Sequence, residues 1–417
     1  MSEAPPPLRN KLTSTFLPAC TKVGIRRLLN VARSCYYLSL FAFIFAPVML
    51  LAYIFAKRRF VVIDGGRIGP LATGPNIFMR LELAGCEYKH ICICGQVANS
   101  ALVDLMSRQI PIVVSPVIYK ISTYALNIFT RFIDLPFIRY PDLGEYASTL
   151  NSAPSPLKFT ECEEHQGRQA LFEAGIDADD WFVCFHARTP IYLANAFPGQ
   201  DWGYHDYRDC SIDNYVTTAI EIVKRGGFAI RMGAKGEEPY GGTDDPQIID
   251  YANEFKSEFM DIYLAAHCKF LLCGGGSGIG ALAFQFDRPV IWANLIPLPY
   301  IPWRSDDLII PKLIWDEKAG RFLTFAEMHS LGLIAGINGG ESRFYLDRGL
   351  RPVENSPEDL LDIALEMFDQ VNGVARSNRE LELQREFKKT YFSHVPDYQK
   401  ASNIGSRFLA KHEFLMG

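Results

Sequence analysis

The first part of the chain alternates between short apolar runs and longer stretches of helical periodicity. Apolar runs lie at residues 60–63, 90–94 and 110–114, and helical stretches lie between them at about 75–84 and 99–108. Short apolar runs that alternate with amphipathic helices indicate parallel strands joined by helical crossovers. The pattern therefore predicts an α/β domain with a parallel sheet.

The same alternation starts again after a stretch at 140–180 that is richer in Pro, Ser, Asn and acidic residues and holds one helical pattern at 161–174. Such a composition is typical of a connection between domains. The sequence therefore predicts two doubly wound, Rossmann-like domains. In the second domain the apolar runs are 181–187, 228–232, 269–273 and 289–293, and the helical stretches are about 211–225, 250–266 and 278–286.

A chain of 417 residues is too long for one ordinary core and suits two domains with appendages. We expect a membrane-anchoring segment at 1–59, an N-terminal domain at 60–150, a linker at 151–180 and a C-terminal domain at 181–355. Two helical patterns follow in residues 356–417, and we expect these C-terminal helices to cross back to the N-terminal domain.

The stretch 35–56 carries no charged residue over 22 positions. At about 1.5 Å per residue it is long enough to cross a hydrocarbon core of about 30 Å. Pro47 permits a kink, so a spanning and a re-entrant helix are both open, and a buried hairpin within the soluble fold is the alternative. Upstream, Lys22, Arg26 and Arg33 share one helix face, as in basic helices that lie on anionic lipid. We therefore expect membrane lipids as a partner.

Charge and cysteine content narrow the class of protein. The formal net charge is -5, with 42 Lys and Arg against 47 Asp and Glu, which argues against a nucleic-acid partner. The ten cysteines show neither CxxC pairs nor metal-ligand spacing. Cysteines of this kind are typical of small buried residues in a reducing compartment. We therefore expect the folded part to face the cytoplasm, at the inner membrane.

Residues 269–294 place a strand, a glycine turn, a helix and a second strand in immediate succession. The first amides of such a helix are unpaired and attract phosphate. The spacing fits neither G-x-G-x-x-G after a first strand nor G-x-x-x-x-G-K-[ST], so the dinucleotide and P-loop interpretations do not follow. The pattern indicates either an anion-binding turn or a tight strand-to-helix turn, formed by Gly276, Ser277 and Gly278.

Two arginines follow predicted strands of the same sheet. Arg188 comes after the strand 181–187, and Arg231 lies within the strand end at 228–232. Ligands of open α/β sheets bind at the carboxyl ends of the strands, and the planar guanidinium suits phosphate. We therefore expect both arginines to converge on a diphosphate. The alternative is that each only pairs with a nearby carboxylate such as Asp209 or Asp261.

Several short motifs resemble those of a family of bacterial glycosyltransferases of the GT-B type, which have two Rossmann-like domains and a cleft between them. The family carries R-I-G-H-L, H-A-R-D-x-x-Y-L, Y-R-D, R-M-G and D-x-Y-L elements and a serine-glycine turn. The corresponding residues here are Arg67-Ile68-Gly69-Pro70-Leu71, His186-Ala187-Arg188-Thr189-Pro190-Ile191-Tyr192-Leu193, Tyr207-Arg208-Asp209, Arg231-Met232-Gly233, Asp261-Ile262-Tyr263-Leu264 and Gly276-Ser277-Gly278.

This resemblance covers about residues 60 to 350 and implies a nucleotide-sugar donor in the C-terminal domain and a glycan or lipid-linked acceptor in the N-terminal domain. The chain departs from the family at two positions, because Pro70 replaces a His and Thr189 replaces an Asp. The His-x-Arg after a strand is also similar to GT-B fucosyltransferases, where the Arg holds the donor diphosphate. That similarity implies the same role for Arg188.

The chemistry of sugar transfer assigns candidate roles to these positions. As the base we rank Asp64, at the first glycine turn, over His186, with Arg188 stabilising the leaving group. No metal or other cofactor is expected, since Asp177 and Asp179 precede a strand instead of following it. The donor-binding candidates are Arg188, Arg231, Gly233, Asp261, Gly276, Ser277, Gly278 and Lys312, and the acceptor or interdomain candidates are Arg67, Gly69, Tyr207, Arg208 and Asp209.

The sequence thus favours a membrane-associated, metal-independent glycosyltransferase that builds a cell-surface glycan. Two alternatives stay open: a scaffold protein with a catalytically decayed glycosyltransferase fold, and an epimerase that acts on nucleotide sugars. Pro70 and Thr189 favour the scaffold, because a transferase of this family would lack its expected groups there.

Overall fold

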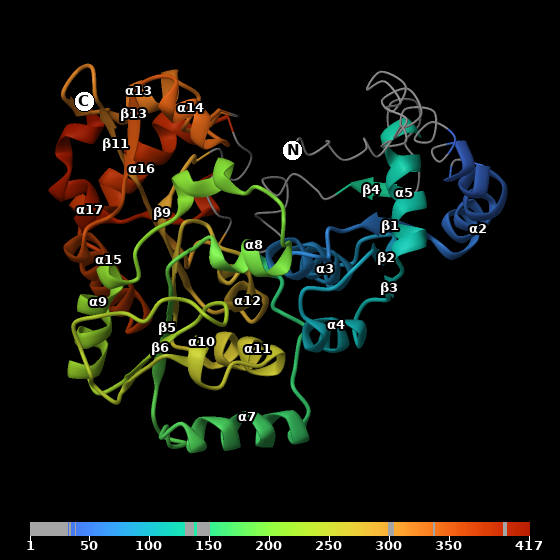
Figure 1. Cartoon of the computed structure of the whole chain (residues 1–417), viewed down its shortest axis with the longest axis horizontal. Helices are drawn as coiled ribbons and strands as arrows, with labels where there is room; N and C mark the ends of the chain where they lie inside the picture. The colour runs from blue at the N-terminus through green and yellow to red at the C-terminus, as the bar shows by residue number, and fades with distance from the viewer. Residues whose placement is uncertain are drawn as a thin grey trace, which may run out of the picture.

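The computed structural model describes residues 32, 35–37, 39–129, 137–139, 151–298, 304–336, 338–394 and 398–417. The chain folds into two α/β halves that lie side by side (Figure 1). A four-stranded sheet forms the first half, and a seven-stranded sheet with a three-stranded sheet beside it forms the second. The predicted α/β class with parallel sheets is confirmed, because every strand pair in the two larger sheets is parallel.

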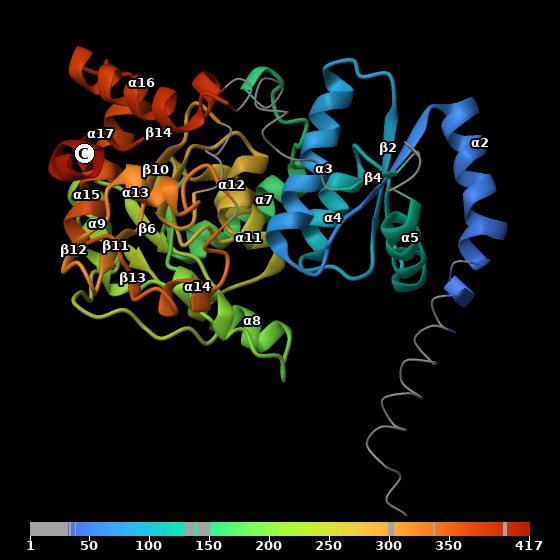
Figure 2. The same ribbon diagram turned by 90° about the horizontal axis from the view of Figure 1, so that it is seen from above.

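The first half contains β1 (Arg58–Val62), α3 (Ile68–Leu83), β2 (Lys89–Cys94), α4 (Ser100–Ser107), β3 (Ile112–Val114), α5 (Pro116–Phe129) and β4 (Phe137–Arg139). The strand order is β3-β2-β1-β4. The three apolar runs predicted as strands form β1, β2 and β3. In Figure 2, α3 and α4 lie on the side of this sheet that faces the second half, and α5 lies on the opposite side.

Helix α3 starts earlier than the sequence predicted. We expected a start near Pro75, whereas the helix begins at Ile68 and carries Pro75 in its interior. All residues from Leu71 to Arg80 are buried. Burial of this whole stretch outweighs the lost amide hydrogen bond at Pro75, since tertiary packing supplies most helical stability in proteins.

The apolar segment covers the outer face of the first sheet. A π-helical turn, η1 (Phe41–Phe45), leads into α2 (Ala46–Ala56), and Cys35–Ala56 is long and apolar enough to cross a membrane, with a mean hydropathy of 2.4. Yet Phe41 and Met49 are buried against residues of the sheet and of α5. Part of the expected anchoring segment 1–59 thus packs on the first half. Lys22, Arg26 and Arg33 lie outside the described residues.

The second half follows the linker helix α7 (Glu161–Glu173). It contains β5 (Phe182–His186), α8 (Ile191–Ala196), the 3-10 helix η3 (Gly203–Arg208), α9 (Asp213–Lys224), β6 (Phe228–Arg231), β7 (Ile248–Ile249), α10 (Tyr251–Glu254), α11 (Glu258–His267), β8 (Leu271–Gly274), α12 (Gly280–Gln285), β9 (Val290–Leu295) and β10 (Leu308–Pro311). The predicted strands are confirmed. The single helix predicted at 250–266 is instead split into α10 and α11, because the Ser257 side chain accepts the Met260 amide and starts a new helix.

The remaining elements are β11 (Leu313–Asp316), β12 (Arg321–Phe322), α13 (Phe325–Ser330), α14 (Ser342–Leu346), β13 (Leu350–Val353), α15 (Pro357–Val371), α16 (Asn378–Phe392), the 3-10 helix η4 (Tyr398–Lys400), β14 (Asn403–Ile404), α17 (Ser406–Lys411) and the 3-10 helix η5 (Glu413–Met416). The seven-stranded order is β14-β10-β9-β8-β5-β6-β7, and β12-β11-β13 is antiparallel.

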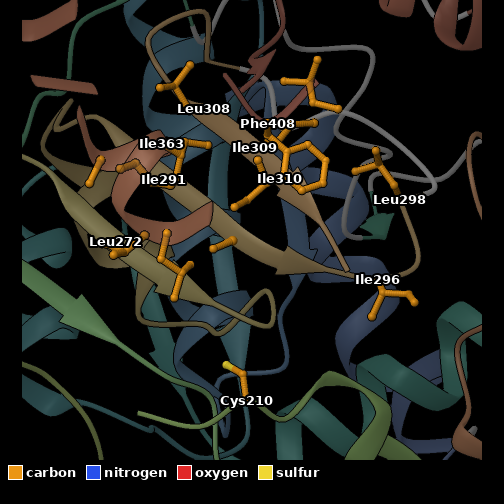
Figure 3. Close-up of a cluster of buried hydrophobic side chains, with 14 of the residues drawn as sticks. Cys210, Leu272, Ile291, Ile296, Leu298, Leu308, Ile309, Ile310, Ile363 and Phe408 are labelled. Atoms are coloured by element: carbon orange, nitrogen blue, oxygen red, sulfur yellow. The ribbon is translucent and has the colours of Figure 1, made fainter. Parts of the chain in front are cut away.

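The C-terminal helices stay on the second half. Helix α15 packs on α9, and β14 extends the seven-stranded sheet beyond the boundary predicted at residue 355. Figure 3 shows Leu272, Ile291 and Ile309 of the sheet together with Ile363 of α15 and Phe408 of α17. Apolar burial here, and not a return to the first half, determines where these helices lie (Figure 2).

Direct packing joins the two halves. Helix α3 lies on α12, and α4 lies on α11. A Cβ on Gly278 would come within 2.6 Å of Ile68 Cγ2 and 2.7 Å of the Gly69 amide nitrogen, so only glycine allows this approach. Arg80 of α3 is buried and donates to the Asp287 carboxylate of the second half at 2.8 Å. The halves are therefore held in a fixed relation around the space between them.

Candidate active site

A cavity of about 720 Å³ lies at the carboxyl edge of the second sheet, facing the first half. The second half supplies the end of β5, the segment after β6, the glycine turn after β8 and the start of α11. The start of α3 and the residues before α4 close the other side. Parallel sheets bind ligands at this edge, so the cavity is the candidate active site.

The predicted site residues divide into two sets. Those that line the cavity are Arg67, Gly69, His186, Arg188, Arg208, Gly233, Asp261, Gly276, Ser277 and Gly278. Those that lie outside its lining are Asp64, Tyr207, Asp209, Arg231 and Lys312. Residues from most of the motifs thus line the same cavity. The other five predicted positions are not part of its lining.

The glycine turn is shaped by close contacts that exclude side chains. Gly275 and Gly276 have φ values of 61° and 59°, and a Cβ on Gly275 would lie 2.3 Å from the carbonyl oxygen of Arg208. Arg208 fixes the turn by donating from Nε to Gly275 O at 3.0 Å and from a terminal nitrogen to Gly276 O at 2.6 Å. In the described part of the chain the amides of Gly276 and Gly278 donate to no acceptor. They are available to an anion in the cavity.

Arginines from both halves concentrate positive charge at this turn. Burial, together with Arg208, Arg188 and Arg67, lowers the pKa of His205 to about 4. His205 lines the cavity, so all three guanidinium groups act on the same space. Burial and the neighbouring Arg208 also lower the pKa of Arg188 to about 10, which leaves it charged at neutral pH. The cavity is therefore suited to a highly charged anion.

Protein contacts fix the positions of Arg188 and Arg208. Arg188 is mostly buried and forms a short ion pair with Asp209. Asp209 in turn presents its backbone carbonyl to Lys312 Nζ at 2.5 Å. Lys312 is buried below the site, so its charge supports the loop that carries Asp209. Lys312 was expected to contact the donor, but it lies outside the lining of the cavity and donates to Asp209 instead.

Arg231 does not share the cavity with Arg188. Its side chain is 1% exposed, and its terminal nitrogens donate to Glu237 and Asp250, each at 3.1 Å. The two carboxylates draw the guanidinium into the interior, so the expected convergence on a diphosphate is wrong for this residue. Glu237 itself lines the cavity and also accepts the Ala234 amide at 2.9 Å. Arg231 therefore acts by holding Glu237.

Gly233 is explained by the same carboxylate. A Cβ at this position would lie 2.6 Å from Glu237 Oε2, so a side chain here would displace Glu237. Thr189, the residue where an Asp was expected, donates from its hydroxyl to the other Glu237 oxygen at 3.3 Å. An Asp at 189 would instead place a second negative charge against Glu237. The departure at Thr189 is therefore compatible with this local hydrogen-bond network.

His186 is neutral and oriented. Its Nδ1 lies 3.0 Å from the carbonyl oxygen of Met232, which only accepts, so Nδ1 carries the proton and Nε2 is left as an acceptor. Burial lowers the pKa of His186 below its usual value of 6.5. A neutral imidazole with a free acceptor nitrogen in the wall of the cavity can accept a proton.

Asp261 is bound on several sides. Lys256 Nζ lies 2.5 and 2.6 Å from its two oxygens, and the Tyr251 hydroxyl donates to Oδ1 at 2.9 Å. Burial raises the pKa of Asp261 above its usual value, although Lys256 opposes this shift. Both Asp261 and Lys256 line the cavity, so a ligand would meet an ion pair there and not an isolated carboxylate.

The first half contributes a rim of polar and small residues. Arg67 lines the cavity and donates from Nε to Asp64 at 2.8 Å. The Asp64 side chain is 45% exposed and lies outside the lining, so it is displaced from the position expected of a base. Pro70 does line the cavity but has no atom that accepts a proton from an acceptor hydroxyl. Gly69 gives the close approach to Gly278.

Tyr207 and Asp209 also differ from expectation. Tyr207 faces α14, where its ring centroid lies 5.4 Å from that of Tyr345. Asp209 lines a second cavity of about 620 Å³ on the other side of Arg188. Tyr207 therefore has a packing role, and Asp209 positions Arg188 from outside the main cavity.

Sequence reasoning did not select several lining residues. Tyr192, His205, Glu237 and Lys256 all face the cavity. Tyr192 belongs to a motif that was recognised. Its position in α8, the short helix that follows β5, could have indicated that it lies near the cavity. Glu237 and Lys256 lie in loops whose course depends on tertiary contacts, so no local pattern indicated them. Among the described residues, no group of three or more His, Cys, Asp or Glu is arranged to hold a metal ion.

No protein-family model matches the chain, and no curated protein matches it. Solved structures of glycosyltransferases show a distant likeness. The ADP-heptose lps heptosyltransferase II of E. coli is 12% identical over 76% of this chain and 100% of its own, with a TM-score of 0.43.

Two other solved structures give similar values. A glycosyl transferase family 9 protein from Veillonella parvula is 10% identical over 75% of this chain and 97% of its own, with a TM-score of 0.42. An E. coli heptosyltransferase with ADP-2-deoxy-2-fluoro heptose is 11% identical over 61% and 92%, with a TM-score of 0.34. Likeness at this level carries no argument about activity.

Proposed function

We propose that this protein is a glycosyltransferase that moves a sugar from a nucleoside-diphosphate donor to a hydroxyl of a glycan or lipid-linked acceptor. The observation that carries the proposal is the convergence of Arg67, Arg188 and Arg208 on one cavity beside the glycine turn. A cavity of about 720 Å³ is large enough for a nucleotide sugar, which is comparable in size to drug-sized ligands.

In the proposed reaction, the bond between the anomeric carbon and the β-phosphate oxygen breaks, and a bond from the acceptor oxygen to that carbon forms. Negative charge develops on the departing nucleoside diphosphate. Arg188 and the amides of Gly276 and Gly278 are placed to stabilise this charge, and Arg208 holds the turn that presents those amides. These groups make a divalent metal unnecessary, and we propose that the reaction uses none.

The acceptor hydroxyl must lose its proton as the new bond forms. We assign this proton to His186 Nε2, because Nδ1 is committed to Met232 and His186 lines the cavity. Asp64 is the second choice, since it lies at the rim beside Arg67. The acceptor would enter along the first half, past Arg67, Gly69 and Pro70.

We further propose that the acceptor belongs to a cell-surface glycan and that the protein works at the cytoplasmic face of the inner membrane. The apolar stretch at 35–56 supports a membrane contact. Fully buried Cys92, Cys94, Cys184 and Cys273 support a reducing compartment.

The direct test is turnover with a panel of nucleotide sugars and lipid-linked acceptors. The full chain should release nucleoside diphosphate only when donor and acceptor are both present, and the acceptor should gain the mass of one sugar. Isomerised donor without acceptor product would contradict transfer, and so would a failure of every donor in the panel to bind.

A further inference from the structure

The outer face of η1 and α2 is an apolar surface without a protein partner in the described part of the chain. It includes Phe43 and Ile44 of η1 and Val48, Leu51 and Phe55 of α2, which are between 54% and 81% exposed. From residue 44 onward the spacing of four, three and four places these residues on one side of the helix. Exposed apolar surface of this kind marks a site of contact with a partner or a membrane.

The inner side of the same segment contacts the fold near both ends and at two buried residues between them. Phe41 and Met49 are 3% and 5% exposed. Near one end, the ring of Tyr37 stacks on Tyr124 of α5 with centroids 5.5 Å apart. Near the other end, Tyr53 stacks on Tyr88 at 5.1 Å and shares a hydroxyl hydrogen bond of 3.2 Å with it.

The connection from the helix to the first sheet is one residue long. Helix α2 ends at Ala56 and β1 begins at Arg58, so Lys57 alone links them, with a left-handed φ of 48°. Lys57 also pairs with Glu87 at 2.8 Å, and Arg59 lies 4.0 Å from the centroid of Tyr88. These polar contacts bind the helix end to the loop before β2.

These attachments exclude a simple transmembrane crossing for this arrangement. Tyr37 and Tyr53 are 16 residues apart, or about 24 Å along a helix. That is most of the roughly 30 Å hydrocarbon core. A bilayer surrounding the helix would also have to contain α5 and the polar start of β2, which carries Lys89. Only the outer face of α2 can enter lipid without that cost.

Charge complementarity identifies the partner as an anionic bilayer. The 22-residue stretch itself has no charge, and Lys57, Arg58 and Arg59 follow it directly. Before it, the first 34 residues contain one acidic residue, Glu3, against six basic ones: Arg9, Lys11, Lys22, Arg26, Arg27 and Arg33. Basic residues on both sides of an apolar helix face attract anionic headgroups while the apolar face enters the acyl region.

We propose that α2 is a monotopic helix that lies in the plane of an anionic membrane, with its outer face in one leaflet and its inner face on the first sheet. One side of the helix thereby packs on the first half, and the other side contacts the membrane. This inference does not depend on the proposed transferase activity, because it uses no residue of the cavity.

Depth measurement separates an in-plane helix from a crossing one. Phe43→Trp, Val48→Trp and Phe55→Trp variants of the full chain are bound to vesicles that contain phosphatidylglycerol, and quenching by brominated lipids gives the depth of each added indole. An in-plane helix predicts three similar, shallow depths in one leaflet. A helix that crosses with the stretch 35–56 centred in the bilayer would place positions 43 and 48 within about 4 Å of the bilayer centre and position 55 about 14 Å from it, and that result would overturn the proposal.

A charge on the outer face tests the contact itself. Phe55→Asp should weaken binding to these vesicles by about tenfold or more. Leu346→Asp is the matched control, since Leu346 is 76% exposed against 79% for Phe55 but lies on α14 of the second half. Both variants should unfold at the wild-type temperature. Equal vesicle binding by the two variants, or equal binding of wild type to vesicles with and without anionic lipid, would contradict the proposal.

Discussion

The ends of β5 and β6 lie side by side in the second sheet, but the arginines they carry lie in different environments. The register pairs Phe185 with Arg231, so Arg188 follows only a few residues beyond the same edge. Arg188 lines the cavity and stays charged there, although burial lowers its pKa to about 10. Arg231 instead turns into the interior between Glu237 and Asp250. Neighbouring strands can thus deliver the same side chain to a site or to the core.

The carboxylates nearby make this difference. Asp209 meets Arg188 from a loop outside the cavity, which leaves the guanidinium at the cavity wall. Glu237 and Asp250 lie on the interior side of Arg231 and satisfy both of its terminal nitrogens. The strand end therefore sets the backbone position of each arginine. The carboxylates that pair with its guanidinium group determine whether that group lies in the cavity wall or in the interior.

If the end of β5 carries the chemistry, the largest effect should come from His186. His186→Asn keeps an amide donor near the Nδ1 position for Met232 but removes the accepting Nε2, and kcat should fall by about 10²- to 10⁴-fold. Because burial lowers the pKa of His186 below 6.5 and the base must be neutral, the acidic limb of the wild-type kcat/KM profile should have its midpoint below pH 6.5. A midpoint at or above pH 6.5 would exclude His186 as the base.

The end of β6 should matter for stability. Arg231→Met leaves Glu237 and Asp250 without their buried partner and should lower the free energy of unfolding by about 3–5 kcal/mol. Denaturant unfolding followed by circular dichroism measures this change. The matched variant Arg188→Met should cost clearly less, since Asp209 is 22% exposed and can be hydrated. Equal losses in both variants would break the comparison.

Donor affinity should respond in the opposite order. Arg188→Ala should weaken binding of a nucleoside diphosphate by about 1.5–3 kcal/mol, the range for hydrogen bonds to charged groups. Conservative replacement by Lys should restore only part of this loss, because Lys has no planar fork. Calorimetric titration provides the measurement. Wild-type affinity in Arg188→Ala would remove this residue from the site.

The smallest effect is expected from chelation. With the leaving charge met by Arg188 and the amides of the glycine turn, turnover should be unchanged by EDTA. Loss of activity that Mn²⁺ or Mg²⁺ restores would show that protein cations alone do not perform this step.

The sequence predicted much of the fold because periodicity is local. Strands such as β2 and β8 and the capped start of α15 lie within a few residues of their expected positions. Where tertiary contacts dominate, the predictions were wrong. Burial of α3 between the halves carries the helix through Pro75, and the inner face of α2 packs on a sheet that no local pattern could identify.

Several motif residues selected from the sequence line the cavity, whereas lining residues in loops were not selected. His186, Arg188 and the glycine turn follow strands, so topology alone brings them together. Glu237 and Lys256 reach the cavity from loops, and the interior partners of Arg231, Glu237 and Asp250, follow it in the segments after β6 and β7. Pairing across loops is not visible in a single sequence, which is why the role of Arg231 was misassigned.

One titration tests whether Arg188 and the glycine turn form a diphosphate site. A nucleoside diphosphate and its parent nucleoside are each titrated into the full chain without added metal. The account predicts that the diphosphate binds at least about tenfold tighter, since each charge-assisted hydrogen bond contributes about 1.5–3 kcal/mol. It also predicts that Arg188→Ala removes most of this difference while Arg231→Lys leaves it intact. Equal affinity for nucleoside and nucleoside diphosphate would contradict the claim.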